Sequence, residues 1–352
     1  MDRILCLDRL SAVEGDSFSN VHAPWTPAWG RGLYGGVLIA QSLVAAQSTV
    51  HPDFDAHSLH SHFVRPASPV EPITYHVRRV RDGHNYVTRT VEAVQSVGCL
   101  FTATISFMRQ LKSNKSVIEH ANYRPADLQA PPVVLRDESK LSASTEQGIH
   151  RPCDVIRCGI EKGCPRSDVK LSHWIRARGL SHPSPEFPSS TSRKPGRWPS
   201  PTGHGAHLAA VAYMSDNYFI GTVSRVHRLP RFTNDDIIHG ILSRFRGSRE
   251  ESQECQQYLT SLALEEATEN GEVGVHSKVV RMMATLNHTI FFHNPRMFSA
   301  GEWMMAEMET PWAGNERGLV VQRIWSSGGV LIATCFQEGV VRLGQPSRTT
   351  RL

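Results

Sequence analysis

The chain has 352 residues, of which 40% are hydrophobic and 20% are charged, so it is long enough for two ordinary domains that each bury a core. Its formal net charge of +5 suits an anionic partner, and the scattered basic residues argue against nucleic acid. No stretch of about 18 apolar residues occurs, so no membrane-spanning helix is predicted. Asp8 and Glu14 interrupt any apolar N-terminal segment, so no secretory signal is predicted and we expect an intracellular location.

The first predicted domain covers residues 15–110. Gly35 and Gly36 open an apolar segment, VLIAQSLVAAQSTV, whose apolar positions roughly follow a period of 3.6, which predicts a mostly buried helix. Strand-like segments follow, with β-branched or aromatic residues between polar ones: HSLHSHFVRPA, ITYHVRRVRDG, NYVTRTVEAVQ and CLFTATISFMR. One helix followed by a run of antiparallel strands predicts an α+β arrangement.

Residues 111–169 are predicted to be a linker, and residues 170–345 a second domain with two insertions. The insertion at 181–205 is rich in proline, serine and glycine, which favours an irregular or loosely packed segment. The insertion at 224–278 contains EESQECQQYLTSLALEEATE, which is predicted to be an exposed helix. Between linker and first insertion, HWIRARG at 173–179 is predicted to be a strand.

The linker contains three cysteines, Cys153, Cys158 and Cys164, with His150 nearby, which are residue types that bind zinc. No C-x-x-C pair is present, so loop thiols are the favoured interpretation and no metal or other cofactor is predicted. The total of seven cysteines is odd, which argues against a disulfide framework in a chain of this size.

The second domain repeats the order of the first. HLAAVAYMSDNYFIGT predicts a helix over 207–222, and four strands are predicted after it: MMATLNHTIFFH, WMMAEMETPWA, RGLVVQRIWS and GVLIATCFQEGVVRL. This repetition indicates an internal duplication. The predicted fold is therefore an α+β double hot-dog, in which two antiparallel sheets in one chain each wrap a helix.

Six stretches carry a resemblance to a known family: YGGVLIAQSLVAA, HSLHSHFVRPASP, HLAAVAYMSD, TLNHTIFFHNP, ETPWAGNERGLVVQRIW and TCFQEGVVRL. In this order they are similar to the acyl-CoA thioesterase II family, the double hot-dog acyl-CoA thioesterases. The resemblance implies hydrolysis of an acyl-CoA to a free carboxylic acid and coenzyme A, without a cofactor.

The resemblance also implies a catalytic site in which an acid, a hydroxyl and an amide surround one water. These roles fall on Asp216, Thr285 and Gln337. Two positions depart from the family's usual LDHS motif, since this chain has Asn287 and Thr289 in LNHT. The gap from Asp216 to Thr285 is also longer than usual because of the insertion at 224–278.

Four further residues are predicted to bind substrate: Gly35, Gly36, His62 and Arg65. The glycines allow close backbone approach, although packing alone also explains them. His60 and His62 are two positions apart on a predicted strand, so their side chains share a face. A pair of metal ligands is one interpretation, but a half-exposed sheet surface is the favoured one. The positive charge of Arg65 could bind the phosphates of coenzyme A, although a charged side chain on a solvent-exposed strand face is an equally good explanation.

Other functions stay open at this point. A non-catalytic acyl-CoA-binding protein, a hot-dog dehydratase and a thioesterase of a specialised biosynthetic pathway are alternatives. No Gly-x-Ser-x-Gly, Walker A or Gly-x-Gly-x-x-Gly pattern occurs, which argues against a serine α/β-hydrolase and against nucleotide chemistry.

The final residues Thr350, Arg351 and Leu352 loosely resemble the Ser-Lys-Leu peroxisomal address. Pairing of such two-domain units into a homo-oligomer is also left open.

Overall fold

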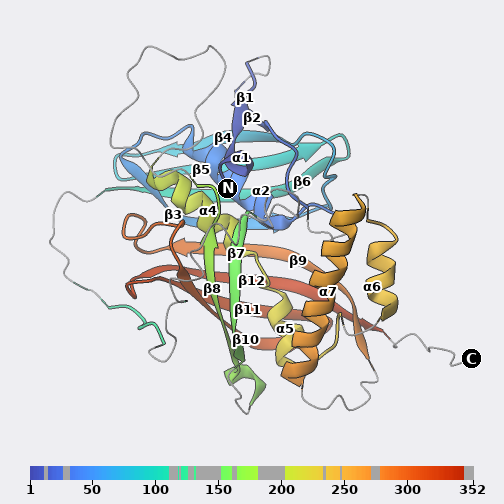
Figure 1. Ribbon diagram of the computed structural model, residues 1–352. Helices are drawn as coiled ribbons and strands as arrows, with labels where there is room; N and C mark the ends of the chain where they lie inside the picture. Colours follow the sequence, from blue (N-terminus) through green and yellow to red (C-terminus); the bar gives the residue numbers. More distant parts are fainter. Residues whose placement is uncertain are drawn as a thin grey trace, which may run out of the picture.

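A computed structural model gives the arrangement of the chain in space (Figure 1). It describes residues 1–11, 15–26, 32–110, 118, 120–125, 131, 152–160, 165–180, 203–232, 235–245, 248–270 and 278–344. The strands of these residues form one antiparallel sheet of 12 strands, in the order β1-β2-β4-β5-β6-β3-β9-β12-β11-β10-β8-β7.

The first half of the sheet comes from the N-terminal part of the chain. Its elements are α1 (Asp2–Leu5), β1 (Leu7–Arg9), β2 (Asp16–Asn20), α2 (Gly35–Gln47), β3 (Phe54–Phe63), β4 (Thr74–Asp82), β5 (Tyr86–Gln95) and β6 (Gly98–Arg109). The helix and four strands predicted for this half are confirmed. The elements α1, β1 and β2 were not predicted, because each is too short to show a periodic pattern.

The second half repeats the arrangement. It consists of β7 (Cys153–Ile160), the 3-10 turn η2 (Arg166–Asp168), β8 (Lys170–Ala177), α4 (His204–Ser215), α5 (Gly221–Val226), α6 (Asp235–Leu242), α7 (Arg249–Asn270), β9 (Val279–Phe292), β10 (Met304–Gly314), β11 (Arg317–Ser326) and β12 (Leu331–Gly344). The halves join where β3 pairs with β9, from Ser58 opposite Phe291 to His62 opposite Asn287. The prediction of an α+β double hot-dog is confirmed.

Within the range predicted to be a linker, residues Cys153–Ile160 form β7, which pairs with β8 as part of the second half of the sheet. The exact domain boundaries stay a prediction. The insertion at 224–278 contains α6 and α7, and α7 confirms the helix predicted there. Residues 181–202 lie outside the described part of the chain, and α4 begins just after them.

The two central helices, α2 and α4, pack against each other between the sheet halves (Figure 1). Both are buried almost all round, from Gly36 to Ala46 and from Ala206 to Ser215. A helix covered by sheet on one side and by a second helix on the other needs no polar face, which explains the weak amphipathic pattern. The helix predicted over 207–222 ends earlier, at Ser215, because the chain turns there.

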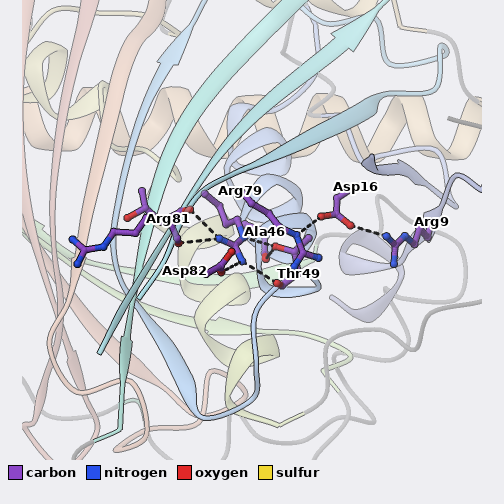
Figure 2. Close-up of polar contacts among 9 residues, drawn as sticks. Arg9, Asp16, Ala46, Thr49, Arg79, Arg81 and Asp82 are labelled. Atoms are coloured by element: carbon purple, nitrogen blue, oxygen red, sulfur yellow. Dashed lines mark hydrogen bonds and ion pairs between the residues drawn. The ribbon is translucent and has the colours of Figure 1, made fainter. Parts of the chain in front are cut away.

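The end of α2 is fixed by Arg89 of β5, whose side chain is only 1% exposed. Its guanidinium donates to the carbonyl and hydroxyl oxygens of Thr49 at 3.1 and 2.8 Å, and it pairs with Asp82. Figure 2 shows Thr49 and Asp82 converging on this point, next to a surface chain of Arg9, Asp16 and Arg79. A cation at this place complements the negative C-terminal end of the helix. Arg89 therefore has a structural role.

Candidate active site

Asp216 follows the last residue of α4 and faces the beginning of α2. A Cβ atom placed on Gly35 would lie 2.8 Å from Oδ2 of Asp216, and one placed on Gly36 would lie 2.4 Å from the carbonyl oxygen of Tyr213. The backbone N–H of Gly36 donates a hydrogen bond to the Asp216 carboxylate. The two glycines are therefore required by the close contact between the helices, and they leave the carboxylate beside the positive end of α2.

Gln337, on β12, is the second predicted site residue that the structure brings to this point. Its Nε2 donates to Oδ1 of Asp216 at 2.6 Å, although 121 positions separate the two residues in the chain. The Gln337 side chain is fully buried. Its Oε1 has no hydrogen-bond partner among the described residues, so one acceptor at the site is available to a water or a ligand.

His288 of β9 completes a hydrogen-bond network around Gln337. Its Nδ1 accepts from Nε2 of Gln337 at 3.1 Å, and its Nε2 lies 2.9 Å from the hydroxyl of Ser215, which itself donates to the carbonyl of Ala212. These partners assign the proton of the ring to Nε2. Burial lowers the pKa of His288 to about 3, so the ring is neutral and orients the amide of Gln337.

His288 stands in the LNHT stretch but was not among the predicted site residues. The signal was available, because a histidine between alternating polar and apolar residues of a strand is placed on a defined face.

The electrostatic state of Asp216 follows from its surroundings. Burial raises the pKa of the carboxyl to about 7, and the hydrogen bonds from Gln337 and from the N–H of Gly36 oppose that rise. Tyr34 and Tyr213 enclose this region, and the Tyr34 hydroxyl donates to the Tyr213 carbonyl at 2.9 Å. A carboxylate whose pKa lies near neutrality suits a general base.

Thr285 reaches the same face of the sheet through a β-bulge. Gln337 pairs with His288, and two positions along β12 Gly339 pairs with Thr285, so Leu286 is an extra residue in β9. Residues opposite each other in antiparallel strands share a face, so Thr285 lies on the face of Gln337. Regular alternation would have put it on the other side. Thr285 does not hydrogen-bond to Asp216 or Gln337.

The two departures from the family motif lie on the opposite face of β9. Asn287 donates from Nδ2 to Oε2 of Glu338 at 3.1 Å, and the hydroxyl of Thr289 lies 3.3 Å from Nδ1 of His60. Neither residue faces Gln337, because the side chains of a strand alternate. The departures therefore leave the Asp216–Gln337 contact unchanged.

His62 and Arg65 lie away from this cluster. His62 pairs with Asn287 and is exposed on the outer face of the sheet. The guanidinium of Arg65 is exposed and donates to the carbonyl of Val97 in the turn between β5 and β6. Neither side chain hydrogen-bonds to Asp216 or Gln337, and their role in substrate binding stays a prediction.

No group of three or more His, Cys, Asp or Glu side chains that could hold a metal ion occurs among the residues that the structure describes. Cys153 and Cys158 lie on β7, while Cys164 and His150 fall outside the described ranges. In the same part of the chain, no helix has the length and apolar character that a membrane span requires.

Comparison with known proteins matches both halves of the chain. Residues 22–108 match the family model of the acyl-CoA thioesterase N-terminal domain, and residues 125–341 match that of the C-terminal domain. Acyl-coenzyme A thioesterase 8 of Mus musculus is 28% identical over 350 residues, which cover 95% of this chain and 87% of that protein.

Peroxisomal acyl-coenzyme A thioester hydrolase 1 of Saccharomyces cerevisiae is 25% identical over 382 residues, which cover 98% of this chain and 95% of that protein. The crystal structure of the acyl-CoA thioesterase II TesB2 from Mycobacterium marinum superposes with a TM-score of 0.60 at 25% identity and covers 99% of this chain and 98% of that one. The chain therefore belongs to the acyl-CoA thioesterase family, with both of its domains present, and is an acyl-CoA thioester hydrolase.

Proposed function

We propose that this chain hydrolyses its acyl-CoA substrate by direct attack of a water molecule that Asp216, Thr285 and Gln337 position. The observation that carries the proposal is the 2.6 Å hydrogen bond between Gln337 and Asp216. It joins a helix end and a strand far apart in sequence, and it lies beside the beginning of α2. The proposal gives the bulge at Leu286 a function, since it turns Thr285 toward the same face.

In the proposed reaction the ionised carboxylate of Asp216 takes a proton from the water while the water oxygen bonds to the thioester carbonyl carbon. The carbon–sulfur bond then breaks, and the thiolate of coenzyme A leaves and takes up a proton. Water and thioester are thus converted to a carboxylic acid and a thiol. A thioester is electrophilic enough that no covalent nucleophile is needed. The Oε1 of Gln337 is the acceptor that holds the water.

The beginning of α2 is suited to the negative charge that develops on the carbonyl oxygen. Backbone N–H groups in the first turn of a helix lack intrahelical partners, and the helix dipole is positive there. Gly35 has no side chain to keep a substrate away from these groups. We place the thioester at Gly35, while the N–H of Gly36 is already engaged by Asp216.

The role of Thr285 is tested by changing its hydroxyl alone. Thr285→Val keeps the branched shape that suits the strand, and we expect kcat to fall about tenfold, which is the effect of losing one water-positioning hydrogen bond. Thr285→Ser keeps the hydroxyl and should retain most of the activity. The measurement is release of free thiol from a panel of acyl-CoAs of different chain length. Unchanged activity in Thr285→Val would remove Thr285 from the site.

The same panel also tests the function itself. Release of thiol from one or more acyl-CoAs is expected, and the best substrate would give the preferred acyl group. Binding of acyl-CoA without release from any member of the panel would favour a non-catalytic acyl-CoA-binding protein.

We also propose a peroxisomal location, which is supported by the name of the Saccharomyces cerevisiae relative. The chain carrying a fluorescent protein at its N-terminus should colocalise with a peroxisomal marker. A diffuse signal would contradict this.

Assembly into a homo-oligomer stays a prediction that sedimentation of the purified chain would decide.

A further inference from the structure

The turn that follows Asp216 has an unusual backbone conformation. Tyr218, two positions later, has a φ of 58°, in the left-handed region that residues with a side chain rarely adopt. Holding a non-glycine residue there costs on the order of 1 kcal/mol or more, so the surroundings must enforce it. The next residue, Phe219, packs edge-on against His288 with ring centroids 5.4 Å apart, so this turn connects directly to the hydrogen-bond network of Gln337.

The side chain of Tyr218 is held from three sides. The ring of His173 from β8 stands edge-on to it at 5.7 Å between centroids, and the guanidinium carbon of Arg157 from β7 lies 5.3 Å from its ring centroid. Its hydroxyl forms a hydrogen bond with the hydroxyl of Tyr258. Tyr258 lies on α7, which means that the insertion at 224–278 contacts the turn next to Asp216.

The helix that carries Tyr258 is itself fixed in place. Oε2 of Glu266, on α7, accepts the backbone N–H groups of Arg231 and Phe232 at 3.0 and 2.8 Å. Phe232 belongs to a small separate core between α6 and α7, with Ile241, Cys255, Leu259 and Leu262. Figure 1 shows α6 and α7 side by side. The described residues of the insertion thus form a packed unit against which Tyr218 is held.

We propose that Tyr258 is a positioning residue for hydrolysis: through the hydroxyl of Tyr218 it keeps the turn in its left-handed conformation and thereby holds Asp216 against Gln337 and Gly36. This rests on the proposed catalytic role of Asp216. The insertion, which the sequence left without a role, then serves the active site through the side chain of Tyr258.

The proposal predicts how catalysis changes when the contact is lost. Without the hydroxyl of Tyr258, the turn gains freedom to relax toward the right-handed region, and the hydrogen bonds from Gln337 and Gly36 to Asp216 lengthen. These bonds oppose the effect of burial on the Asp216 carboxyl. Their weakening therefore moves the midpoint of the pH dependence of kcat upward.

Charged and titratable side chains from several elements surround the turn. They are Arg157 on β7, His173 on β8, Arg225 on α5, Arg231 after α5, and Glu266 and Tyr258 on α7, and Asp216 itself is faced by Tyr34 before α2 and Tyr213 on α4. His173 accepts from Arg225 at 2.9 Å, and burial together with Arg225 and Arg157 keeps its pKa well below the usual value. Replacing tyrosine with phenylalanine at 258 changes the charge of none of them at neutral pH.

The test is Tyr258→Phe in the full chain, with thiol release from an acyl-CoA measured between about pH 5 and 9. We expect kcat to fall about threefold to tenfold, KM to change less than twofold, and the midpoint of the pH dependence to rise by about half a unit. Gln257→Ala, at an exposed neighbouring position of α7, is the matched control and should match the parent chain. Tyr218→Phe removes the same hydrogen bond, so the double variant should be no worse than either single variant.

An unchanged kcat in Tyr258→Phe would overturn the proposal. So would a lower kcat with an unmoved midpoint, since that would show only a general loosening of the fold. Failure of the underlying mechanism looks different, because Asp216→Asn would then retain activity whatever Tyr258→Phe does.

Discussion

Replacing Asp216 with asparagine should lower kcat for acyl-CoA hydrolysis by about 10²–10⁴-fold, the usual contribution of a general base. Asparagine has nearly the same shape, and its side-chain oxygen can still accept from Gln337, so the variant removes the base with little change in shape. KM should change little, because the carboxylate acts on the attacking water and the thioester is bound at the beginning of α2. Thiol release under saturating acyl-CoA measures this, with Asp53→Asn, at an exposed surface position, as the control.

The same variant should be more stable than the parent chain at neutral and higher pH. Because burial raises the pKa of Asp216 from 3.8 to about 7, the folded state binds this proton more tightly than the unfolded state does. The contribution of Asp216 to the stability of the parent chain is therefore fully present below about pH 4 and is lost as the pH rises through 7. Asp216→Asn removes that loss, which is worth on the order of 1–4 kcal/mol above pH 7. A denaturant titration at pH 5 and pH 8 should show a gain that grows with pH.

The second large effect is expected at Gly36. A methyl group in Gly36→Ala would lie 2.4 Å from both the Tyr213 carbonyl oxygen and a ring carbon of Tyr34, so α2 and α4 must move apart. Overpacking of this kind costs about 1–3 kcal/mol, and a shift of α2 also displaces the N–H that binds Asp216. We expect a lower free energy of unfolding and a reduced kcat together.

Gly205 offers a matched control at the beginning of the other central helix. A Cβ on Gly205 meets its nearest atoms, on the side chain of Gln47, at 3.4 Å, which is ordinary contact. Gly205→Ala should therefore stay within about 1 kcal/mol of the parent chain, since alanine also has the higher helix propensity. Equal effects of the two substitutions would mean that the helices do not meet as closely at Gly36 as the structure has it.

Much of the fold was predictable because its elements are long and regular. The helices around Gly36 and Leu208 are long apolar segments, and the strands from β3 to β6 and β9 to β12 have the alternating pattern of half-buried strands. The repeated order of these elements indicates the duplication. β7 was not predicted because it is short and prolines and glycines flank it in the sequence, which favours a loop. The helix end at Ser215 was missed because the apolar pattern continues past it into a turn that contains the left-handed residue Tyr218, and a tyrosine gives no signal for such a turn.

Part of the candidate site could also be predicted from the sequence, and part could not. The meeting of Asp216 with Gln337 followed from the family motifs, and the structure supplies the contact that joins them. The placement of Thr285 depends on the extra residue Leu286, and a register shift of one position is not visible in the sequence of a single strand. The contact of Tyr258 with Tyr218 depends on how an inserted helix docks, which no local pattern encodes.

The pH dependence of kcat in the parent chain and in Asp216→Asn tests the central claim most directly. If a buried carboxylate at Asp216 is the base, the activity of the parent chain should fall about tenfold per pH unit below a midpoint near 7, where the carboxyl takes up its proton, and should be constant above it. The residual activity of Asp216→Asn should lack this midpoint. A parent midpoint near 4 would contradict the raised pKa of Asp216, and the same midpoint in both chains would show that another group activates the water.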